Sequence, residues 1–219
     1  MGRIIVYGDI HGCLDEWQEL RKKIGASAND TEISVGDLVS KGTKVAETIR
    51  YARENGVITV LGNHEDRYLE IATGVYGQTL ERERILRTPF NNASDLAYLF
   101  AMPRFVRIAN LTIVHAGLTN SVALDRLHSD HYAVLTRLRY IGTGAMDYRF
   151  WSELYNGNQG FVVYGHTPCN IRRDRYALGI DTGCVYGGKL TAAIFTRTGS
   201  SIDTKNYAIA DVSAHDRYA

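Results

Sequence analysis

Five short segments of the sequence each place an Asp, Asn or His beside glycine, directly after an apolar run. They read Gly8-Asp9-Ile10-His11-Gly12, Gly36-Asp37-Leu38-Val39-Ser40-Lys41-Gly42, Gly62-Asn63-His64-Glu65, Val114-His115-Ala116-Gly117 and Tyr164-Gly165-His166-Thr167-Pro168. Glycine lets the backbone turn sharply and lets a ligand approach closely. One such segment alone is typical of an ordinary turn or a core histidine. Five in order, holding four of the chain's seven histidines, indicate a chemical site.

The residue types in these segments are those of a metal centre. Asp9 and His11 stand two residues apart, so on extended backbone both side chains point to one face and can bind one ion. Asp37 can offer one carboxylate oxygen to each of two ions. A nitrogen–oxygen ligand set without thiolate favours Mn, Fe, Zn or Mg over soft metals. Two ions about 3.5–4 Å apart can hold a bridging hydroxide and a phosphoryl group together. The predicted ligands are Asp9, His11, Asp37, Asn63, His115 and His166.

The five segments resemble the signatures of the calcineurin-like metallophosphoesterases, specifically the phosphoprotein phosphatase superfamily: GDxHG, GDxVxRG, GNHE, an HGG-like turn and a later GH. The similarity extends from Gly8 to about Gly188. It implies an α/β fold, a four-layer α/β/β/α sandwich of two mixed sheets with the metal site at one edge. It also implies how the ligands divide. One ion would be held by Asp9, His11 and Asp37, and the other by Asp37, Asn63, His115 and His166.

The resemblance implies that Asp37 and His64 are catalytic, with His64 as the general acid that protonates the leaving oxygen. The second motif departs from the protein-phosphatase pattern, because Ser40-Lys41 replaces Asp-Arg. The missing Asp would have oriented His64, so another group or water must do so. Lys41 can hold phosphate as a point charge but lacks the fork of arginine. Leu61 stands where protein phosphatases often carry a phosphate-binding Arg.

Both departures resemble the branch of bacterial symmetrical diadenosine tetraphosphatases and their ApaH-like relatives, and residues 137–141 and 180–191 agree with it. We therefore expect a nucleotide polyphosphatase that converts diadenosine tetraphosphate to ADP or cleaves a related anhydride, such as a cap. A serine/threonine or tyrosine protein phosphatase similar to the compact phage lambda enzyme is an alternative, favoured by Glu65, the short chain and residues 165–168. A non-catalytic metal-binding module is a distant alternative, against which the intact ligand set argues.

The expected cofactors are two divalent metal ions, with Mn²⁺ first and Fe, Zn, Mg or Co as alternatives. The expected partner is a phosphate-containing small molecule or a phosphoprotein. Arginines often pair or pack on a surface, and Tyr186 fits a core position as well as a stacking one, so several side chains are only candidates for phosphate binding. These candidates are Lys41, Arg139, Arg149 and Tyr186.

Short strands alternating with helices must position these residues. Strands are expected at residues 3–8, 32–36, 57–61, 105–108, 111–115, 161–164, 176–181 and 190–196. Helices are expected at residues 15–24 and 44–54, with two or three more within 65–102. An α/β first half and a strand-rich second half predict packed sheets with helices outside, and ligands bind where strands end. Residues 199–219 are expected to form a final strand plus a frayed tail.

The composition fits this reading. A chain of 219 residues is expected to form one metallophosphoesterase domain, 1–219, and its 45% hydrophobic content is ordinary for a globular protein. A net charge of +1 argues against generic nucleic-acid binding. The sequence has no apolar run of about 18–20 residues that could span a membrane. It also lacks a signal peptide and CxxC spacing among its three cysteines, so we expect a cytoplasmic protein.

Overall fold

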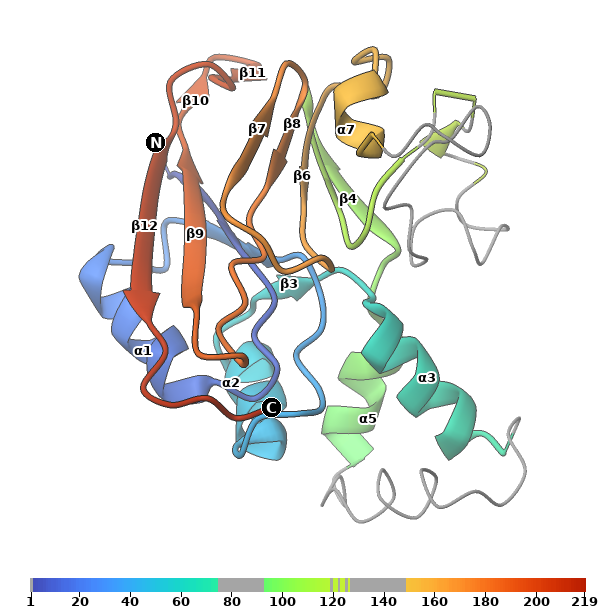
Figure 1. Ribbon diagram of the computed structural model, residues 1–219, viewed down its shortest axis with the longest axis vertical. Helices are drawn as coiled ribbons and strands as arrows, with labels where there is room; N and C mark the ends of the chain where they lie inside the picture. The colour runs from blue at the N-terminus through green and yellow to red at the C-terminus, as the bar shows by residue number, and fades with distance from the viewer. Residues whose placement is uncertain (1, 75–92, 119, 122, 125, 127–148) are drawn as a thin grey trace.

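The computed structural model describes residues 2–74, 93–118, 120–121, 123–124, 126 and 149–219. Two five-stranded sheets face each other (Figure 1). The first sheet contains, in spatial order, β12 (Ala208–Ser213), β9 (Lys189–Phe195), β1 (Ile4–Tyr7), β2 (Thr31–Ser34) and β3 (Ile58–Thr59). The second contains β4 (Phe105–Ile108), β5 (Leu111–Val114), β6 (Phe161–Tyr164), β8 (Ala177–Gly179) and β7 (Arg172–Asp174). A separate hairpin joins β10 (Arg197–Thr198) and β11 (Ser201–Ile202).

The direction of the strands explains why the five motifs can meet. In the first sheet β1, β2 and β3 are parallel neighbours, and in the second β5 and β6 are parallel neighbours. The other pairs at the sheet edges are antiparallel, so both sheets are mixed, as expected. Parallel neighbours end at the same edge of a sheet, where ligands bind in α/β folds. The five motifs follow these five strands.

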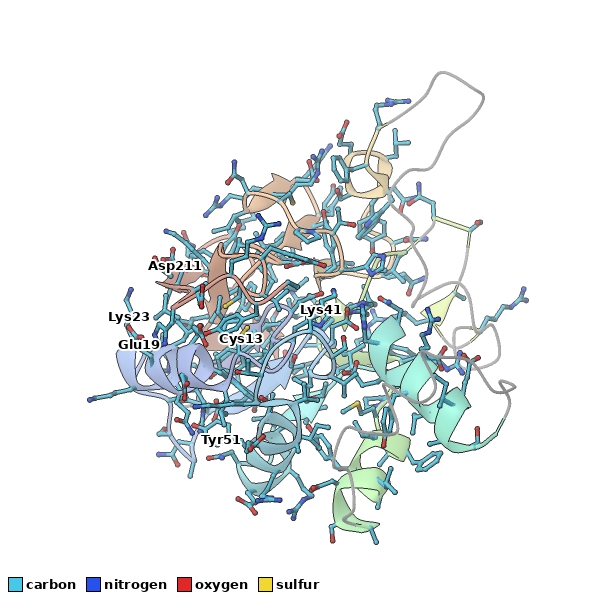
Figure 2. All side chains as sticks on the ribbon, turned by 60° about the horizontal axis from the view of Figure 1, so that its bottom comes forward. Cys13, Glu19, Lys23, Lys41, Tyr51 and Asp211 are labelled. Carbon is cyan, nitrogen blue, oxygen red and sulfur yellow. The ribbon has the colours of Figure 1, made fainter. Side chains whose placement is uncertain are left out.

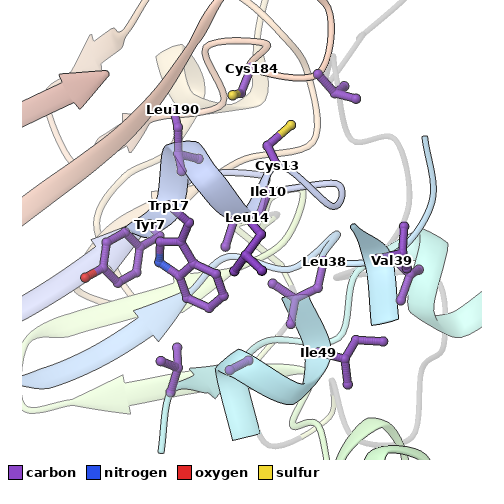
Figure 3. Packing of buried hydrophobic residues seen from close by; sticks show 14 of the residues in the cluster. Tyr7, Ile10, Cys13, Leu14, Trp17, Leu38, Val39, Ile49, Cys184 and Leu190 are labelled. Atoms are coloured by element: carbon purple, nitrogen blue, oxygen red, sulfur yellow. The ribbon is translucent and has the colours of Figure 1, made fainter. Parts of the chain in front are cut away.

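Alternate residues of the central strand β1 face different layers. Ile4 and Val6 pack between the two sheets, in a cluster that includes Ile113 of β5. Tyr7 points to the opposite side, where it meets Trp17 of α1 edge to face with ring centroids 5.6 Å apart (Figure 3). A strand buried on both faces has apolar residues throughout, without alternation. The first sheet is therefore fixed between the second sheet and the helices.

The helices form the outer layers. Those that pack around the first sheet's cluster are α1 (Leu14–Lys23), α2 (Val45–Glu54), α3 (Asn63–Ala72) and α5 (Ala93–Phe100). On the other side α7 (Trp151–Leu154) covers the second sheet through Trp151, which packs against Val114 and Tyr164. Its Nε1 donates a hydrogen bond to the Ala116 carbonyl at 3.1 Å. The predicted helix–sheet–sheet–helix order is confirmed.

Two local expectations need correction. Helix α3 begins at Asn63, so Asn63 and His64 belong to its first turn instead of preceding it. The C-terminal segment is not frayed: after β12, the backbone N–H groups of Tyr218 and Ala219 donate to the Val185 carbonyl, at 2.9 and 3.1 Å. These bonds tie the tail to the core. Among the described residues, the helices are too short or too polar to cross a bilayer.

Candidate metal centre

Asp37 lies at the middle of the predicted ligands and is almost completely buried. Its Oδ2 lies 3.5 Å from Nε2 of His11, and its Oδ1 lies 3.5 Å from Nε2 of His115. Each carboxylate oxygen therefore faces a different histidine. Two groups of donor atoms share this carboxylate, and within each group the atoms lie within 4.8 Å of one another. The groups are His11, Asp37 and His64, and Asp37, His115 and His166.

Asn63 brings an amide oxygen to the second group. Its Oδ1 lies 3.0 Å from Nε2 of His115 and 2.8 Å from Nδ1 of His166. The two imidazole nitrogens are themselves 3.2 Å apart. Imidazole lone pairs and a carbonyl oxygen that converge in this way are the ligands that a divalent cation of intermediate softness prefers. The donor set thus fits a metal ion.

Two histidines of the centre are held by backbone carbonyls. Nδ1 of His11 lies 3.0 Å from the Val39 carbonyl, and Nδ1 of His115 lies 3.0 Å from the Val35 carbonyl. A carbonyl only accepts hydrogen bonds, so Nδ1 carries the proton in both rings. The lone pair is then on Nε2, which faces Asp37. An imidazole whose other nitrogen is fixed in this way is the usual arrangement of a metal-binding histidine.

Asp9 joins the centre through the loop that follows β6. Both of its carboxylate oxygens accept the backbone N–H of His166, at 3.1 Å each. This approach requires glycine at position 165, because a Cβ there would come within 2.0 Å of Asp9 Oδ1. His166 itself has φ of 74°, a strained conformation for a non-glycine residue. Of the six described non-glycine residues with positive φ, five surround this centre: His11, Asp37, Ser40, Lys41 and His166.

The electrostatics of the cluster also favour bound cations. Burial, then the charges of Asp181 and Asp37, raise the pKa of Asp9 well above its usual range. Burial also raises the pKa values of Asp37 and Asp181 to about 7. Carboxylates crowded in a buried site repel one another, and divalent ions relieve that repulsion. Burial lowers the pKa of His115 to about 4, so its imidazole stays neutral and able to bind a metal.

Glu65 is a structural residue of the site, for which the sequence suggested only a bearing on the class of phosphatase. It is completely buried. Its carboxylate accepts the backbone N–H groups of Asp37 and Val39 at 2.9 Å each, and that of Gly62 at 3.0 Å. One side chain therefore fixes the loop that follows β2 to the loop that follows β3.

Asp181 is a second residue that the sequence analysis did not assign to the site. It follows β8 and is buried, and its Oδ1 accepts the Gly183 N–H at 3.0 Å. Its charge acts on Asp9, as described above. The signal was present in the sequence, since Ile180-Asp181-Thr182-Gly183 repeats the pattern of an apolar residue, an acid and a nearby glycine.

His64 faces the centre with one nitrogen and Ser40 with the other. Nε2 lies 3.9 Å from Asp37 Oδ2, whereas Nδ1 lies 2.6 Å from the Ser40 hydroxyl. The hydroxyl therefore occupies the orienting position that the sequence left without an acid. Burial, with a smaller effect of the Lys41 charge, lowers the pKa of His64 to about 3.

The four phosphate-binding candidates lie in different places. Nζ of Lys41 lies 2.9 Å from His11 Nε2 and 5.1 Å from the ring centroid of Tyr186, and Figure 2 shows Lys41 in the central part of the molecule. Tyr186 is 39% exposed, so it lies at the rim of the site and not in the core. Arg149 is exposed just before α7. Arg139 lies outside the described residues. The structure thus brings Lys41 and Tyr186 together beside the centre.

Known proteins resemble this chain over most of its length. Residues 2–203 match the Calcineurin-like phosphoesterase family. The asymmetrical bis(5'-nucleosyl)-tetraphosphatase PrpE of Anoxybacillus flavithermus is 30% identical over 225 residues, covering 85% of this chain and 88% of that protein. The symmetrical bis(5'-nucleosyl)-tetraphosphatase of Vibrio parahaemolyticus is 26% identical over 251 residues, covering 85% and 92%.

A solved structure agrees with these relatives. A crystal structure of a protein proposed to be a diadenosine tetraphosphatase superposes with a TM-score of 0.77 at 27% identity, covering 97% of this chain and 94% of that one. The family match includes the whole second sheet, every strand of the first sheet except β12, and all five motif loops. This chain therefore belongs to the calcineurin-like phosphoesterase family, and it is a metal-dependent hydrolase of phosphoric esters or anhydrides.

Proposed function

We propose that this enzyme is a nucleotide polyphosphatase that uses two divalent metal ions to cleave a phosphoanhydride bond. The position of Asp37 is the main support for two metal ions, because its two carboxylate oxygens face His11 and His115 separately. The names of the relatives, symmetrical and asymmetrical bis(5'-nucleosyl)-tetraphosphatases, support a dinucleoside polyphosphate as the substrate class.

The proposed ligands divide around Asp37. Metal ions bound there supply Lewis acidity and an activated water near neutral pH. Mn²⁺ is the first expectation, and Fe, Zn, Mg or Co are compatible with the same nitrogen–oxygen set. One ion would be held by Asp9, His11 and Asp37, and the other by Asp37, Asn63, His115 and His166.

Three further side chains, His64, Ser40 and Lys41, take part in the proposed reaction. If the Ser40 hydroxyl donates to Nδ1, the neutral ring of His64 carries its proton on Nε2, which faces the centre and can pass that proton to the leaving oxygen as the phosphorus–oxygen bond breaks. Ser40 holds the other ring nitrogen. Lys41 faces the free phosphate oxygens as a point charge. Water adds to phosphorus and the anhydride opens, so central cleavage of diadenosine tetraphosphate releases two ADP.

With His64 as the general acid, a phosphoanhydride is a better substrate than a phosphoserine ester. A serine hydroxyl holds the ring of His64 in place, but it does not carry the negative charge with which an aspartate would stabilise the protonated imidazole. A nucleoside diphosphate leaves as a weak base and needs little protonation, whereas a serine alkoxide needs much more. Leu61 is buried and supplies no cation at the position where the protein-phosphatase pattern often has a phosphate-binding Arg.

The test uses metal-stripped protein to which Mn²⁺ is returned. Diadenosine tetraphosphate, a phosphoserine peptide and p-nitrophenyl phosphate are supplied in parallel, and kcat/KM is measured for each. We expect the dinucleotide to have the highest kcat/KM, ADP to be the only nucleotide product, and elemental analysis to find about two ions per chain.

Three results would count against parts of this proposal. A phosphopeptide rate far above the dinucleotide rate would identify a protein phosphatase. Release of ATP and AMP would mean asymmetrical cleavage of the same substrate. Equal activity of the stripped and the loaded protein would remove the metal centre from the reaction.

A further inference from the structure

A cleft of about 750 Å³ lies on the surface beside the metal centre. It is lined by residues 168–171, which follow the His166 loop, by the connection between β8 and β9, and by residues of β7, β9 and β12. The walls combine an aromatic ring, cationic groups, hydroxyl groups and one acid. The side chains that matter here are Arg173, Thr182, Tyr186, Lys189 and Asp211.

The cleft is connected to the centre through Lys41 and Tyr186. The Lys41 ammonium lies 2.9 Å from His11 Nε2, and the same ammonium lies 5.1 Å from the centroid of the Tyr186 ring. The Tyr186 ring in turn lines the cleft. Cys169, which also lines the cleft, donates its N–H to the carbonyl of Asp181 at 3.0 Å. A substrate whose phosphate sits at the metal centre can therefore extend directly into the cleft.

Arg173 turns toward the cleft because of its place in β7. Neighbouring residues of a strand point to opposite faces. Arg172 points away from the cleft, where its Nε donates to Asp174 at 2.9 Å and its guanidinium covers the Phe150 ring at 3.8 Å. Arg173 is exposed and lines the cleft, and no ion pair engages it within the described part of the chain. Its guanidinium is thus available to a ligand.

The second cation of the cleft, Lys189, is already engaged. Its Nζ lies 3.1 Å from Asp211 Oδ1, and the backbone carbonyl of Asp211 also accepts a hydrogen bond from Lys23 at 2.6 Å (Figure 2). Asp211 therefore neutralises this side of the cleft. The positive charge offered to a ligand is concentrated at Arg173.

The loop that presents Tyr186 is held in one conformation. Gly183 and Gly187 have φ of 71° and 84°, values that side chains rarely adopt. The N–H of Tyr186 donates to the Gly183 carbonyl at 3.0 Å, and the Thr182 hydroxyl donates to the Lys189 carbonyl at 2.6 Å. A loop whose backbone is fixed before binding loses little conformational entropy when a ligand stacks on the aromatic ring that it presents. Tyr186 is thus a preformed platform.

We propose that this cleft is the nucleotide subsite of the enzyme, with the base against the ring of Tyr186 and phosphate oxygens on the guanidinium of Arg173. The inference rests on the proposed function and extends it from the phosphate to the nucleoside. A half-exposed aromatic ring can stack on the flat face of any base, whichever hydrogen-bond donors and acceptors the base carries at its edge. The planar guanidinium matches phosphate oxygens in a two-pronged contact.

The experiment compares two substrates on four variants. Tyr186→Leu removes the ring and keeps its bulk, Arg173→Gln removes the charge, and Tyr186→Phe keeps the ring. Arg50→Gln is the matched control, because Arg50 is exposed on α2 and its replacement removes the same charge. For each protein we measure the ratio of kcat/KM for diadenosine tetraphosphate to kcat/KM for p-nitrophenyl phosphate, which has no nucleoside.

We expect the ratio to fall at least about fivefold in Tyr186→Leu and in Arg173→Gln, in line with the loss of a base–aromatic or guanidinium contact. Arg50→Gln should stay within about twofold of the unmodified protein, as surface changes without a ligand contact do, whereas Tyr186→Phe should lose less of the ratio than Tyr186→Leu because it keeps the stacking ring. The ratio cancels any displacement of Lys41, since Lys41 serves both substrates. With p-nitrophenyl phosphate as substrate, the inhibition constant of ADP should rise in the first two variants, and that of inorganic phosphate should not.

The possible failures are distinct. If the ratio is unchanged in both Tyr186→Leu and Arg173→Gln while the unmodified protein cleaves the dinucleotide, the cleft is not the nucleotide subsite and the proposed function stands. If the unmodified protein hydrolyses p-nitrophenyl phosphate with Mn²⁺ but no nucleotide polyphosphate, the proposed function fails and this inference fails with it.

Discussion

The hydroxyl of Ser40 lies 2.6 Å from Nδ1 of His64, across 24 residues of sequence. It stands where the protein-phosphatase pattern has an aspartate. A hydroxyl can fix the orientation of the imidazole through one hydrogen bond, but it adds no charge to the pair. The contact therefore separates two tasks that an aspartate performs together: it positions the ring without stabilising its protonated form.

Removal of this hydroxyl should slow reactions that depend on protonation of the leaving group. Ser40 has φ of 70°, so Ser40→Gly removes the side chain without backbone strain. Loss of one orienting hydrogen bond should lower kcat for phenyl phosphate about tenfold, with a smaller loss for p-nitrophenyl phosphate, which leaves more easily. KM should change little. Ser40→Asn, which tolerates this φ and restores a polar group, should recover part of the rate. Equal losses on both substrates would contradict the positioning role.

Replacement of His64 tests the general acid itself. His64→Asn should lower turnover by on the order of 10²–10⁴-fold while the protein still takes up metal. We expect metal uptake to persist because His64 Nε2 lies 3.9 Å from Asp37, farther than the 3.5 Å that separates Asp37 from the Nε2 atoms of the two proposed ligand histidines. Steady-state kinetics and elemental analysis of the same preparation provide the measurement. Unchanged turnover would remove His64 from this role.

The glycine before His166 should be indispensable for the centre. In Gly165→Ala the new Cβ would meet Asp9 Oδ1 at 2.0 Å, so the carboxylate or the His166 loop must move. We expect metal content and activity to fall together, each at least about tenfold, as with other displaced ligand shells. Gly199→Ala is the control, because it has positive φ but meets nothing within 4 Å. Gly199→Ala should lower the free energy of unfolding by about 1 kcal/mol and leave the metal content unchanged. Full metal content in Gly165→Ala would show that the contact is easily relieved.

An ion pair far from the centre gives a prediction about acid stability. Asp30 accepts hydrogen bonds from Nε and Nη2 of Arg3, at 3.0 and 2.7 Å, and the guanidinium lowers the pKa of Asp30 well below its usual range. Its stabilising effect is therefore complete above the unfolded-state pKa of about 4 and is lost as the pH falls through the folded-state pKa. Asp30→Asn should lower the free energy of unfolding by about 1–3 kcal/mol at pH 7.

The check is urea unfolding at pH 7 and at pH 3. The difference between Asp30→Asn and the unmodified protein should shrink at the lower pH. Glu54→Gln is the control, since Glu54 is 56% exposed and its contact with Arg53 is 3.4 Å, so its effect should stay within about 0.5 kcal/mol. A difference that is independent of pH would mean that the charge of Asp30 is not what stabilises the fold.

The sequence alone determined the kind of site and the kind of fold. Asp9, Asp37 and His115 each follow an apolar run and stand beside or near glycine, and this is a local pattern that reads directly as strand followed by loop. Because parallel strands end at a common edge, five such patterns were enough to predict that distant residues meet. The structure places donor atoms of His11, Asp37, His115 and His166 near one another, adds the Asn63 amide oxygen, and brings Asp9 to the His166 backbone; their role as metal ligands stays a prediction.

Contacts between loops were decided only by the tertiary structure. From the sequence Glu65 bore only on the class of phosphatase, whereas in the structure its carboxylate holds three backbone N–H groups from two loops. Ser40 read as a missing acid until its hydroxyl was found against His64. Arg172 and Arg173 are adjacent arginines in the sequence, but they occupy opposite faces of β7: Arg172 pairs with Asp174, whereas Arg173 lines the cleft without an ion pair among the described residues. Local patterns encode periodicity and turns, whereas these relationships depend on distances between segments that become neighbours only when two sheets pack.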